Sequence, residues 1–214
     1  MKILNLYACL GGNRYKWNEV RDDIEVTAVE LDPEAARLYQ ERFPNDKVIV
    51  ADAHQYLLDH YKEFNFIWSS PPCPTHSRLQ TSWKNRTKMK YPDMKLYQEI
   101  IFLDNFFNGK YCVENVIPYY EPLIPAKKRG RHLYWTNFNL PNVLGDKKNP
   151  DFSRITNKVK VMSEYHNYDF TKYKGKQSVG KMANNLVHYK AGKTIFETAL
   201  GIISKPKTTQ TSLL

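Results

Sequence analysis

The chain has 214 residues, a length typical of one domain with a full hydrophobic core. Its 32 basic and 22 acidic residues give a net charge of +10, which favours nucleic acid as a partner over a merely solvated basic surface. Three widely spaced cysteines without a CxxC pair, and six histidines without ligand spacing, exclude a disulfide framework and predict no metal site. The sequence shows no signal peptide and no apolar run of about 18 residues, so we expect a cytoplasmic protein without membrane contact.

Short apolar runs alternate with helical patterns over the first 120 residues. The predicted strands are residues 2–6, 26–29, 48–50, 66–68 and 111–113. The predicted helices are residues 33–42, 53–61 and 94–107. This alternation predicts an α/β fold with a mostly parallel sheet and helices on both faces. Ligands of such sheets bind at the carboxyl ends of the strands, where each motif below falls.

The first three strand ends describe a nucleoside-binding edge. Leu10, Gly11 and Gly12 follow the first strand, and glycines there let the backbone approach a ligand, although a plain turn is the alternative. Glu30 ends the second strand, the usual place for a carboxylate that holds ribose hydroxyls. Asp52 ends the third and could accept from an adenine amino group. The sequence lacks GxGxxG and a Walker lysine, which favours S-adenosylmethionine over NAD or ATP.

The next two strand ends supply a nucleophile and an acid. Ser70-Pro71-Pro72-Cys73 follows the fourth strand, and Glu114 follows the fifth. A sulfur and an acid at neighbouring strand ends suit addition to a ring carbon beside a protonatable nitrogen, as in cytosine. The alternative for Cys73 is a small buried hydrophobe, which is the better interpretation for Cys112 in the middle of its strand.

A basic segment follows the nucleophile directly. Its cations interleave with Trp83 and are Arg78, Lys84, Arg86, Lys88 and Lys90. We interpret it as a loop that closes over nucleic acid through phosphate contacts, with a solvated basic loop as the alternative. A weaker basic and aromatic cluster, with three lysines and two tyrosines, lies at residues 168–176.

Taken together, the motifs resemble those of the DNA cytosine-5 methyltransferases, in family order. The segment from Asn5 to Gly12 is similar to the family's opening Asp-Leu-Phe-Ala-Gly-x-Gly-Gly, and Pro71-Pro72-Cys73 to its nucleophile motif. Glu30-Leu31-Asp32 resembles the second motif, Asp52 the third, and Glu114-Asn115-Val116 the Glu-Asn-Val motif. Lys127-Lys128-Arg129-Gly130-Arg131 looks like Gln-x-Arg-x-Arg, and the run from Lys181 to Val187 like Arg-x-x-Gly-Asn-x-Val.

The resemblance implies a Rossmann-like fold that binds S-adenosylmethionine and methylates cytosine at C5 in DNA. It implies that Cys73 adds to C6 of a flipped base, that protonated Glu114 donates to N3, that Arg131 contacts O2, and that Arg129 holds the loop and the acid. Tyr7 would stack on the adenine. The cofactor residues that it implies are Tyr7, Cys9, Leu10, Gly11, Gly12, Glu30, Leu31, Asp52, Ala53, Pro72, Asn185 and Val187.

The chain departs from the family pattern in length and at several positions. Asn5 replaces an acid, Pro74 a glutamine, and Asn184 a glycine. We expect a catalytic core at residues 1–135, a small irregular lobe with reduced target recognition at 136–176, a segment at 177–204 that returns to the core, and a disordered tail at 205–214. The alternatives are an RNA (tRNA) cytosine-5 methyltransferase, and a non-catalytic or split subunit that needs a second protein for recognition. A modification role in a bacterium or phage-infected host is what the resemblance suggests.

Overall fold

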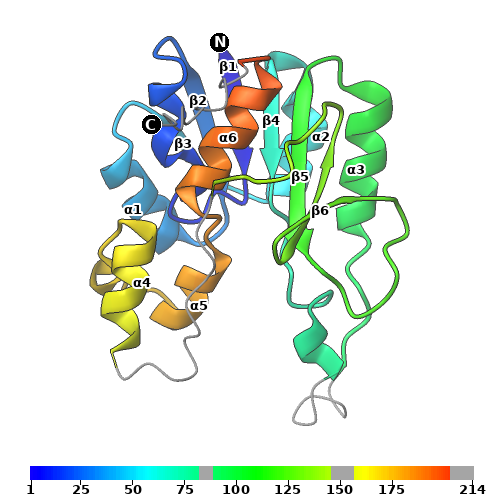
Figure 1. Cartoon of the computed structure of the whole chain (residues 1–214). Helices are drawn as coiled ribbons and strands as arrows, with labels where there is room; N and C mark the ends of the chain where they lie inside the picture. The colour runs from blue at the N-terminus through cyan, green and yellow to red at the C-terminus, as the bar shows by residue number, and fades with distance from the viewer. Residues whose placement is uncertain (82–88, 146–156, 203–214) are drawn as a thin grey trace, which may run out of the picture.

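The computed structural model describes residues 1–81, 89–145 and 157–202. In these residues the strands form one sheet in the order β3-β2-β1-β4-β5-β7-β6 (Figure 1). The strands are β1 (Lys2–Leu6), β2 (Glu25–Glu30), β3 (Lys47–Val50), β4 (Phe66–Ser69), β5 (Lys110–Val116), β6 (Lys127–Arg129) and β7 (His132–Thr136). The first five are parallel, whereas β7 pairs antiparallel with β5 and β6 antiparallel with β7. This is the predicted α/β fold with a mostly parallel sheet.

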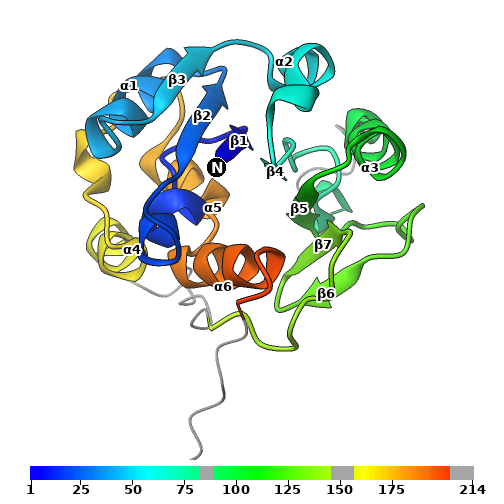
Figure 2. The same ribbon diagram turned by 90° about the horizontal axis from the view of Figure 1, so that it is seen from above.

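Helices cover both faces of the sheet (Figure 2). They are α1 (Pro33–Arg42), α2 (Ala53–His60), α3 (Lys95–Phe106), α4 (Lys158–His166), α5 (Val179–Asn185) and α6 (Tyr189–Ala199), with 3-10 turns η1 (Asn13–Glu19), η2 (Tyr61–Glu63), η3 (Arg78–Thr81) and η6 (Phe170–Lys172). Leu4 and Ile67 pack with α2 and α3 on one face, while Phe66 and Trp68 pack with η1 and α6 on the other. Because neighbouring residues of a strand point to opposite faces, a sheet covered on both sides needs the continuous apolar runs seen in the sequence.

Short polar caps place the helices directly after the strands. The Asp32 side chain accepts from the Glu34 N–H at 3.0 Å and caps α1, with Pro33 in the first turn. The Asp52 side chain accepts from the Gln55 N–H at 2.9 Å and caps α2. Both caps lie at the carboxyl edge of the sheet, so they fix the turns that line this edge.

Strands β6 and β7 and the turn η1 were not among the predicted elements. β6 is a three-residue edge strand made only of Lys127, Lys128 and Arg129, so it carries no apolar signal. β7 holds three consecutive buried apolar residues, Leu133 to Trp135, between the half-buried His132 and Thr136. The observed β5 runs on to Val116 because its pairing with β7 continues past the apolar residues.

The segment after residue 156 packs onto α1 instead of standing apart. Met162 of α4, Phe170 of η6 and Met182 of α5 form one buried cluster with Ala35 and Leu38 of α1. Figure 1 shows α4 and α5 below α1, at the end of the molecule toward which the parallel strands run. Among its described residues, the region predicted as an irregular lobe contains the regular helix α4, and α5 follows this region. None of the helices in the described ranges is long and apolar enough to cross a membrane.

Candidate active site

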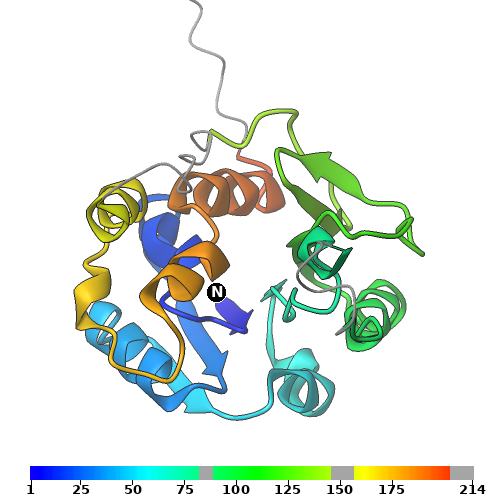
Figure 3. The ribbon, with the colours of Figure 1, turned by 90° about the horizontal axis from the view of Figure 1, so that it is seen from below.

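A cavity of about 890 Å³ lies at the carboxyl ends of the parallel strands. One side of it is formed by residues at or just beyond the carboxyl ends of β1, β2, β3, β4 and β5. The segment from Gly175 to Val187, which includes α5, forms the facing wall. Figure 3 views the molecule from below, the side on which α5 lies over this edge of the sheet. A cavity of this size at the strand ends is of the kind that holds a small ligand in an α/β protein.

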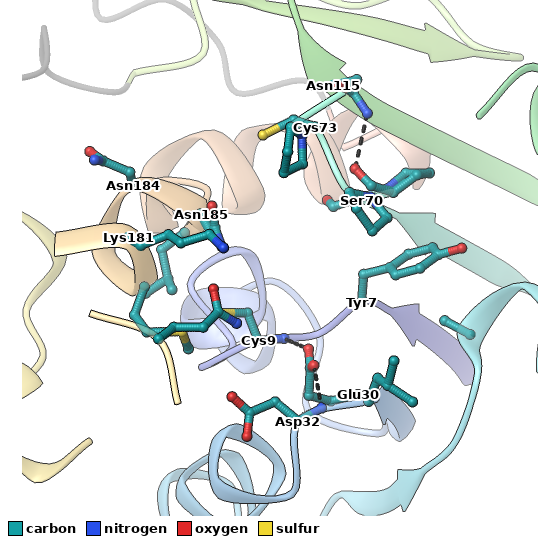
Figure 4. A pocket seen from close by; sticks show the side chains of 18 of the residues that line it. Tyr7, Cys9, Glu30, Asp32, Ser70, Cys73, Asn115, Lys181, Asn184 and Asn185 are labelled. Atoms are coloured by element: carbon teal, nitrogen blue, oxygen red, sulfur yellow. Dashed lines mark hydrogen bonds between the residues drawn. The ribbon is translucent and has the colours of Figure 1, made fainter. Parts of the chain in front are cut away.

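Cys73 reaches this cavity from a rigid turn after β4. The Asn115 Nδ2 donates to the Pro71 carbonyl at 3.0 Å, which fastens the proline segment to the end of β5 (Figure 4). The Cys73 carbonyl accepts from the N–H groups of His76 and Ser77, both at 3.0 Å, which closes the turn. Prolines restrict the backbone before the cysteine. The sulfur is therefore held at the cavity wall, and Cys73 lines the cavity together with Glu114.

Glu114 lies near the end of β5, the strand that pairs with β4, and is 7% exposed. Its Oε1 faces the Nε2 of His132, on β7, at 3.5 Å. β4 and β5 are adjacent and parallel, so the residues that end them meet at one edge. The predicted meeting of the cysteine and the acid is thus present in the structure, although their catalytic roles stay predictions.

Burial and the neighbouring Glu114 both oppose ionisation of Cys73. Burial raises the pKa of the Cys73 thiol, and the charge of Glu114 raises it further. The cations Arg131 and Lys181 act in the opposite sense and lower it. The balance is a raised pKa, so without a ligand the thiol is protonated at neutral pH.

Glu30 binds the backbone of the first two loops. Its Oε2 accepts from the Cys9 N–H at 2.8 Å and its Oε1 from the Asp32 N–H at 2.9 Å (Figure 4). Burial raises the pKa of this carboxyl, while the backbone N–H groups act to lower it. Each oxygen retains a second lone pair toward the cavity that Glu30 lines, which suits a ligand hydroxyl.

Asp52 and Tyr7 extend this half of the cavity. The Gln55 N–H lowers the pKa of the Asp52 carboxyl, as does the Lys95 ammonium group at 3.5 Å. The Tyr7 hydroxyl donates to Glu99 Oε1 at 2.6 Å, so its ring is held beneath the cavity. Of the other predicted cofactor residues, the cavity is lined by Cys9, Leu31, Ala53, Pro72, Asn185 and Val187.

Leu10, Gly11 and Gly12 do not line the cavity. Leu10 is fully buried in the α1 and α5 cluster. A Cβ at Gly11, where φ is +68°, would lie 2.3 Å from the Phe43 ring, and one at Gly12 would lie 2.4 Å from the Val187 carbonyl. Packing against α1 and the chain after α5 therefore explains both glycines, and a close approach to a ligand is not needed for them.

The two arginines of the predicted site differ in position. Arg129 lies on edge strand β6, separated from β5 by β7, and its guanidinium donates to the carbonyls of Lys128, Leu140 and Pro141. These hydrogen bonds hold the chain after β7, and the role expected of Arg129 in holding the loop and the acid stays a prediction. Arg131 follows Gly130 in the β6–β7 hairpin and lies near enough for its charge to lower the pKa of Cys73.

The basic segment is described only at its ends. Arg78 Nε donates to the Pro118 carbonyl at 3.4 Å, and Lys90 is exposed. The predicted nucleic-acid residues Lys84, Arg86 and Lys88 lie outside the described residues.

The cavity also contains residues that sequence reasoning missed. They are Lys95, His76, His132, Lys181 and Asn184. Figure 4 shows Lys181 extending from α5 into the space below Cys73. The last-motif resemblance included Lys181 and Asn184 without giving them a role, and His132 directly follows the arginine motif. Only the fold brings these residues to Cys73 and Glu114.

Comparisons with known proteins concern the family and the fold. The family model of the C-5 cytosine-specific DNA methylase matches residues 1–116, more than half of the chain. No curated protein matches this chain in sequence. A mutant of DNMT2 from Spodoptera frugiperda is 28% identical, with a TM-score of 0.42, over 54% of this chain and 35% of that chain. The chain thus spans about a third of that protein's length.

A second solved structure is similar over nearly the whole chain. The methyltransferase EhMeth from Entamoeba histolytica has a TM-score of 0.55 at 10% identity, covering 96% of this chain and 99% of that chain. At this identity the likeness concerns the fold alone. It supports a Rossmann-like methyltransferase fold.

Proposed function

The chain belongs to the C-5 cytosine-specific DNA methylase family, and from this premise we propose that it methylates C5 of cytosine in DNA, with S-adenosylmethionine as the methyl donor. The observation that carries the proposal is the shared cavity. Cys73 and Glu114, from the ends of β4 and β5, line it together with Glu30 and Asp52, from the ends of β2 and β3. A nucleophile and an acid therefore lie beside a site suited to a nucleoside.

The residues at the ends of the first three strands fit S-adenosylmethionine. Glu30 offers two carboxylate oxygens for ribose hydroxyls, and Asp52 offers an acceptor for the adenine amino group. Leu31, 68% exposed, and Tyr7 provide apolar surface for the adenine. When bound, this cofactor supplies the methyl group that C5 receives.

Cys73 and Glu114 would activate the base together. Once the Cys73 thiol has released its proton to solvent, its sulfur forms a bond to C6. The C5=C6 electron pair then forms C4=C5, the C4=N3 pair moves onto N3, and N3 takes a proton from Glu114. After C5 has received the methyl group, its proton passes to solvent water, the C5–H electron pair reforms C5=C6, the sulfur–C6 bond breaks, and N3 returns its proton to Glu114. The Cys73 sulfur then takes a proton back from solvent. The residues thus end the cycle as they began it.

The electrostatics of the site favour this pairing. A charged Glu114 raises the pKa of Cys73, so a Glu114 that is protonated, as donation to N3 requires, no longer opposes formation of the thiolate. Arg131 and Lys181 then stabilise the thiolate, since both lower its pKa. Proton donation to the base and activation of the nucleophile therefore support one another.

The net charge of +10 suits DNA, and the target base must leave the duplex to reach this cavity. We place Arg131 at the cytosine O2 and the segment from Arg78 to Lys90 on the phosphates. Recognition of sequence would come from the short region between β7 and α5, or from a second subunit.

Trapping tests the proposal. DNA that carries 5-fluorocytosine cannot release the C5 substituent, so the adduct with Cys73 should persist. We expect a protein–DNA species stable to denaturation, formed only with S-adenosylmethionine and mapped by mass spectrometry to the peptide of Cys73. An adduct on another residue, or none, would overturn the proposal.

A further inference from the structure

His132 and Glu114 lie side by side on one face of the sheet. In the antiparallel pairing of β5 with β7, Val116 is opposite His132 and Glu114 is opposite Tyr134. Directly opposite residues share a face, as do residues two apart on one strand. His132 is therefore the diagonal neighbour of Glu114, and its Nε2 lies 3.5 Å from Glu114 Oε1.

Both side chains are largely withdrawn from solvent yet line the cavity. Their side-chain exposures are 17% for His132 and 8% for Glu114. A charge pair in such a place is screened less than one on the surface. The Tyr134 ring lies edge-on to His132, with ring centroids 6.3 Å apart, and limits its orientation.

Other ionisable groups surround the pair. Cys73 faces Glu114 from the nucleophile turn, where Lys181 of α5 and Arg131 of the hairpin also act on the thiol. Lys127 of β6 lies on the Cys112 side of Glu114, and its ammonium group donates to Thr136 and Phe138. Guanidinium and ammonium groups are ordinarily much weaker acids than imidazolium, so His132 is the residue of this group whose side-chain type ordinarily titrates nearest neutral pH.

We propose that His132 is the proton partner of Glu114, a positioning residue that shares one proton with this carboxyl group and aims it at the base. The inference rests on the proposed function and deepens it. In the resting site the proton lies on His132 and Glu114 is a carboxylate. When cytosine enters, Nε2 passes the proton to Glu114, which passes a proton to N3 as the sulfur–C6 bond forms. When that bond breaks, the proton returns from N3 through Glu114 to His132.

The need for a partner follows from ordinary acidities. A lone glutamate has a pKa of about 4.3 and is almost wholly ionised at neutral pH, whereas histidine titrates near 6.5. A pair that shares one proton keeps it up to the higher of these ranges. His132 would therefore keep available the proton that N3 needs.

Titration of the histidine rings tests the pair without any substrate. The 15N–1H spectra of the protein, with His132 assigned through His132→Gln, would be followed against pH in the parent and in Glu114→Gln. An opposite charge within about 4–6 Å shifts a pKa by about 1–3 units, so the His132 pKa should fall by about that amount in Glu114→Gln. His60, which forms an exposed pair with Glu63 at 2.7 Å, should not move.

Single-turnover methyl transfer tests the role. Replacing His132 by Gln leaves Glu114 to carry the proton alone. From the two ordinary pKa values, about 100-fold fewer sites hold this proton at a pH above about 6.5, and the rate should fall by up to that factor. One limb of the pH–rate profile should move about two units lower, while the limb set by Cys73 stays. In Glu114→Gln, adding His132→Gln should cost nothing further, and His60→Gln should match the parent.

The outcomes distinguish a failure of the His132 proposal from a failure of the proposed function. A His132 pKa unchanged in Glu114→Gln overturns the proton partner, as does a His132→Gln rate that falls without a shift of either limb. The proton partner is also overturned if, in the double variant, the loss of rate from His132→Gln adds in full to the loss from Glu114→Gln. A parent protein that shows the titration shift but transfers no methyl group contradicts the proposed function and leaves the shared proton standing.

Discussion

Replacing Glu114 by Gln should change two properties in opposite directions: the thiol of Cys73 should become more reactive, and transfer of the methyl group should become slower. The carboxyl group is buried, and its charge is the second cause, after burial, of the raised pKa of Cys73. Glutamine retains the shape and removes the charge. The Cys73 thiol should therefore ionise at lower pH, while the proton that N3 needs is lost.

The rate of methyl transfer should fall and the rate of alkylation of Cys73 should rise. Losing a positioned acid costs about 100-fold or more in rate, which is about 2.7 kcal/mol of activation free energy. Below the pKa of Cys73, each unit by which that pKa falls makes the thiolate about tenfold more abundant. Alkylation by iodoacetamide should therefore be faster in Glu114→Gln than in the parent, at every pH below this pKa.

The assay measures both rates on the same preparations. Single-turnover transfer uses labelled S-adenosylmethionine and DNA, and alkylation is followed by mass spectrometry of the Cys73 peptide against pH. Glu63→Gln, an exposed carboxylate outside the cavity, serves as the control. Transfer within tenfold of the parent would refute the acid. Slower alkylation together with slower transfer would show that the site had merely collapsed.

Three further predictions concern the rest of the site. Cys73→Ser should abolish methyl transfer and the 5-fluorocytosine adduct while calorimetry still detects S-adenosylmethionine binding, and turnover within tenfold of the parent would mean that another residue attacks the ring. Glu30→Ala and Asp52→Ala should each weaken cofactor binding by about 1–3 kcal/mol in calorimetry, and unchanged affinity in both would overturn the nucleoside edge. Because Glu30 also holds the Cys9 and Asp32 N–H groups, Glu30→Gln is the variant that keeps an acceptor there. Bisulfite sequencing of DNA methylated by the pure protein should show a short or relaxed cytosine context, with DNA affinity that falls steeply with salt, whereas one site of six defined bases would contradict this.

The parallel half of the fold could be predicted because its signals are local. Asp32 before Pro33 fixes the start of α1, and the apolar runs of β1 and β4 reflect a sheet covered on both faces. β6 could not be predicted, since an edge strand of Lys127, Lys128 and Arg129 has no apolar side chain to bury. Its existence depends on pairing with β7, a contact made only in the folded chain.

Part of the candidate site could also be predicted from the sequence, and part could not. Cys73 and Glu114 could be brought together from the sequence because they lie at or just beyond the ends of adjacent parallel strands, and such ends meet at one edge of a sheet. Lys181 and His132 could not, because one lies on a helix that folds back from near the end of the chain and the other on an antiparallel strand. Gly12 was predicted for a ligand, yet the Val187 carbonyl occupies the space where its Cβ would lie.

The most direct test of the central claim is methyl transfer by the purified protein alone. Labelled S-adenosylmethionine would be offered with DNA and with tRNA in parallel, to the parent and to Cys73→Ser, and the modified base would be identified after digestion. The account predicts label on C5 of cytosine in DNA, dependent on Cys73. Label in tRNA alone would contradict DNA as the substrate, and label in DNA that persists in Cys73→Ser would contradict the chemistry assigned to the cavity.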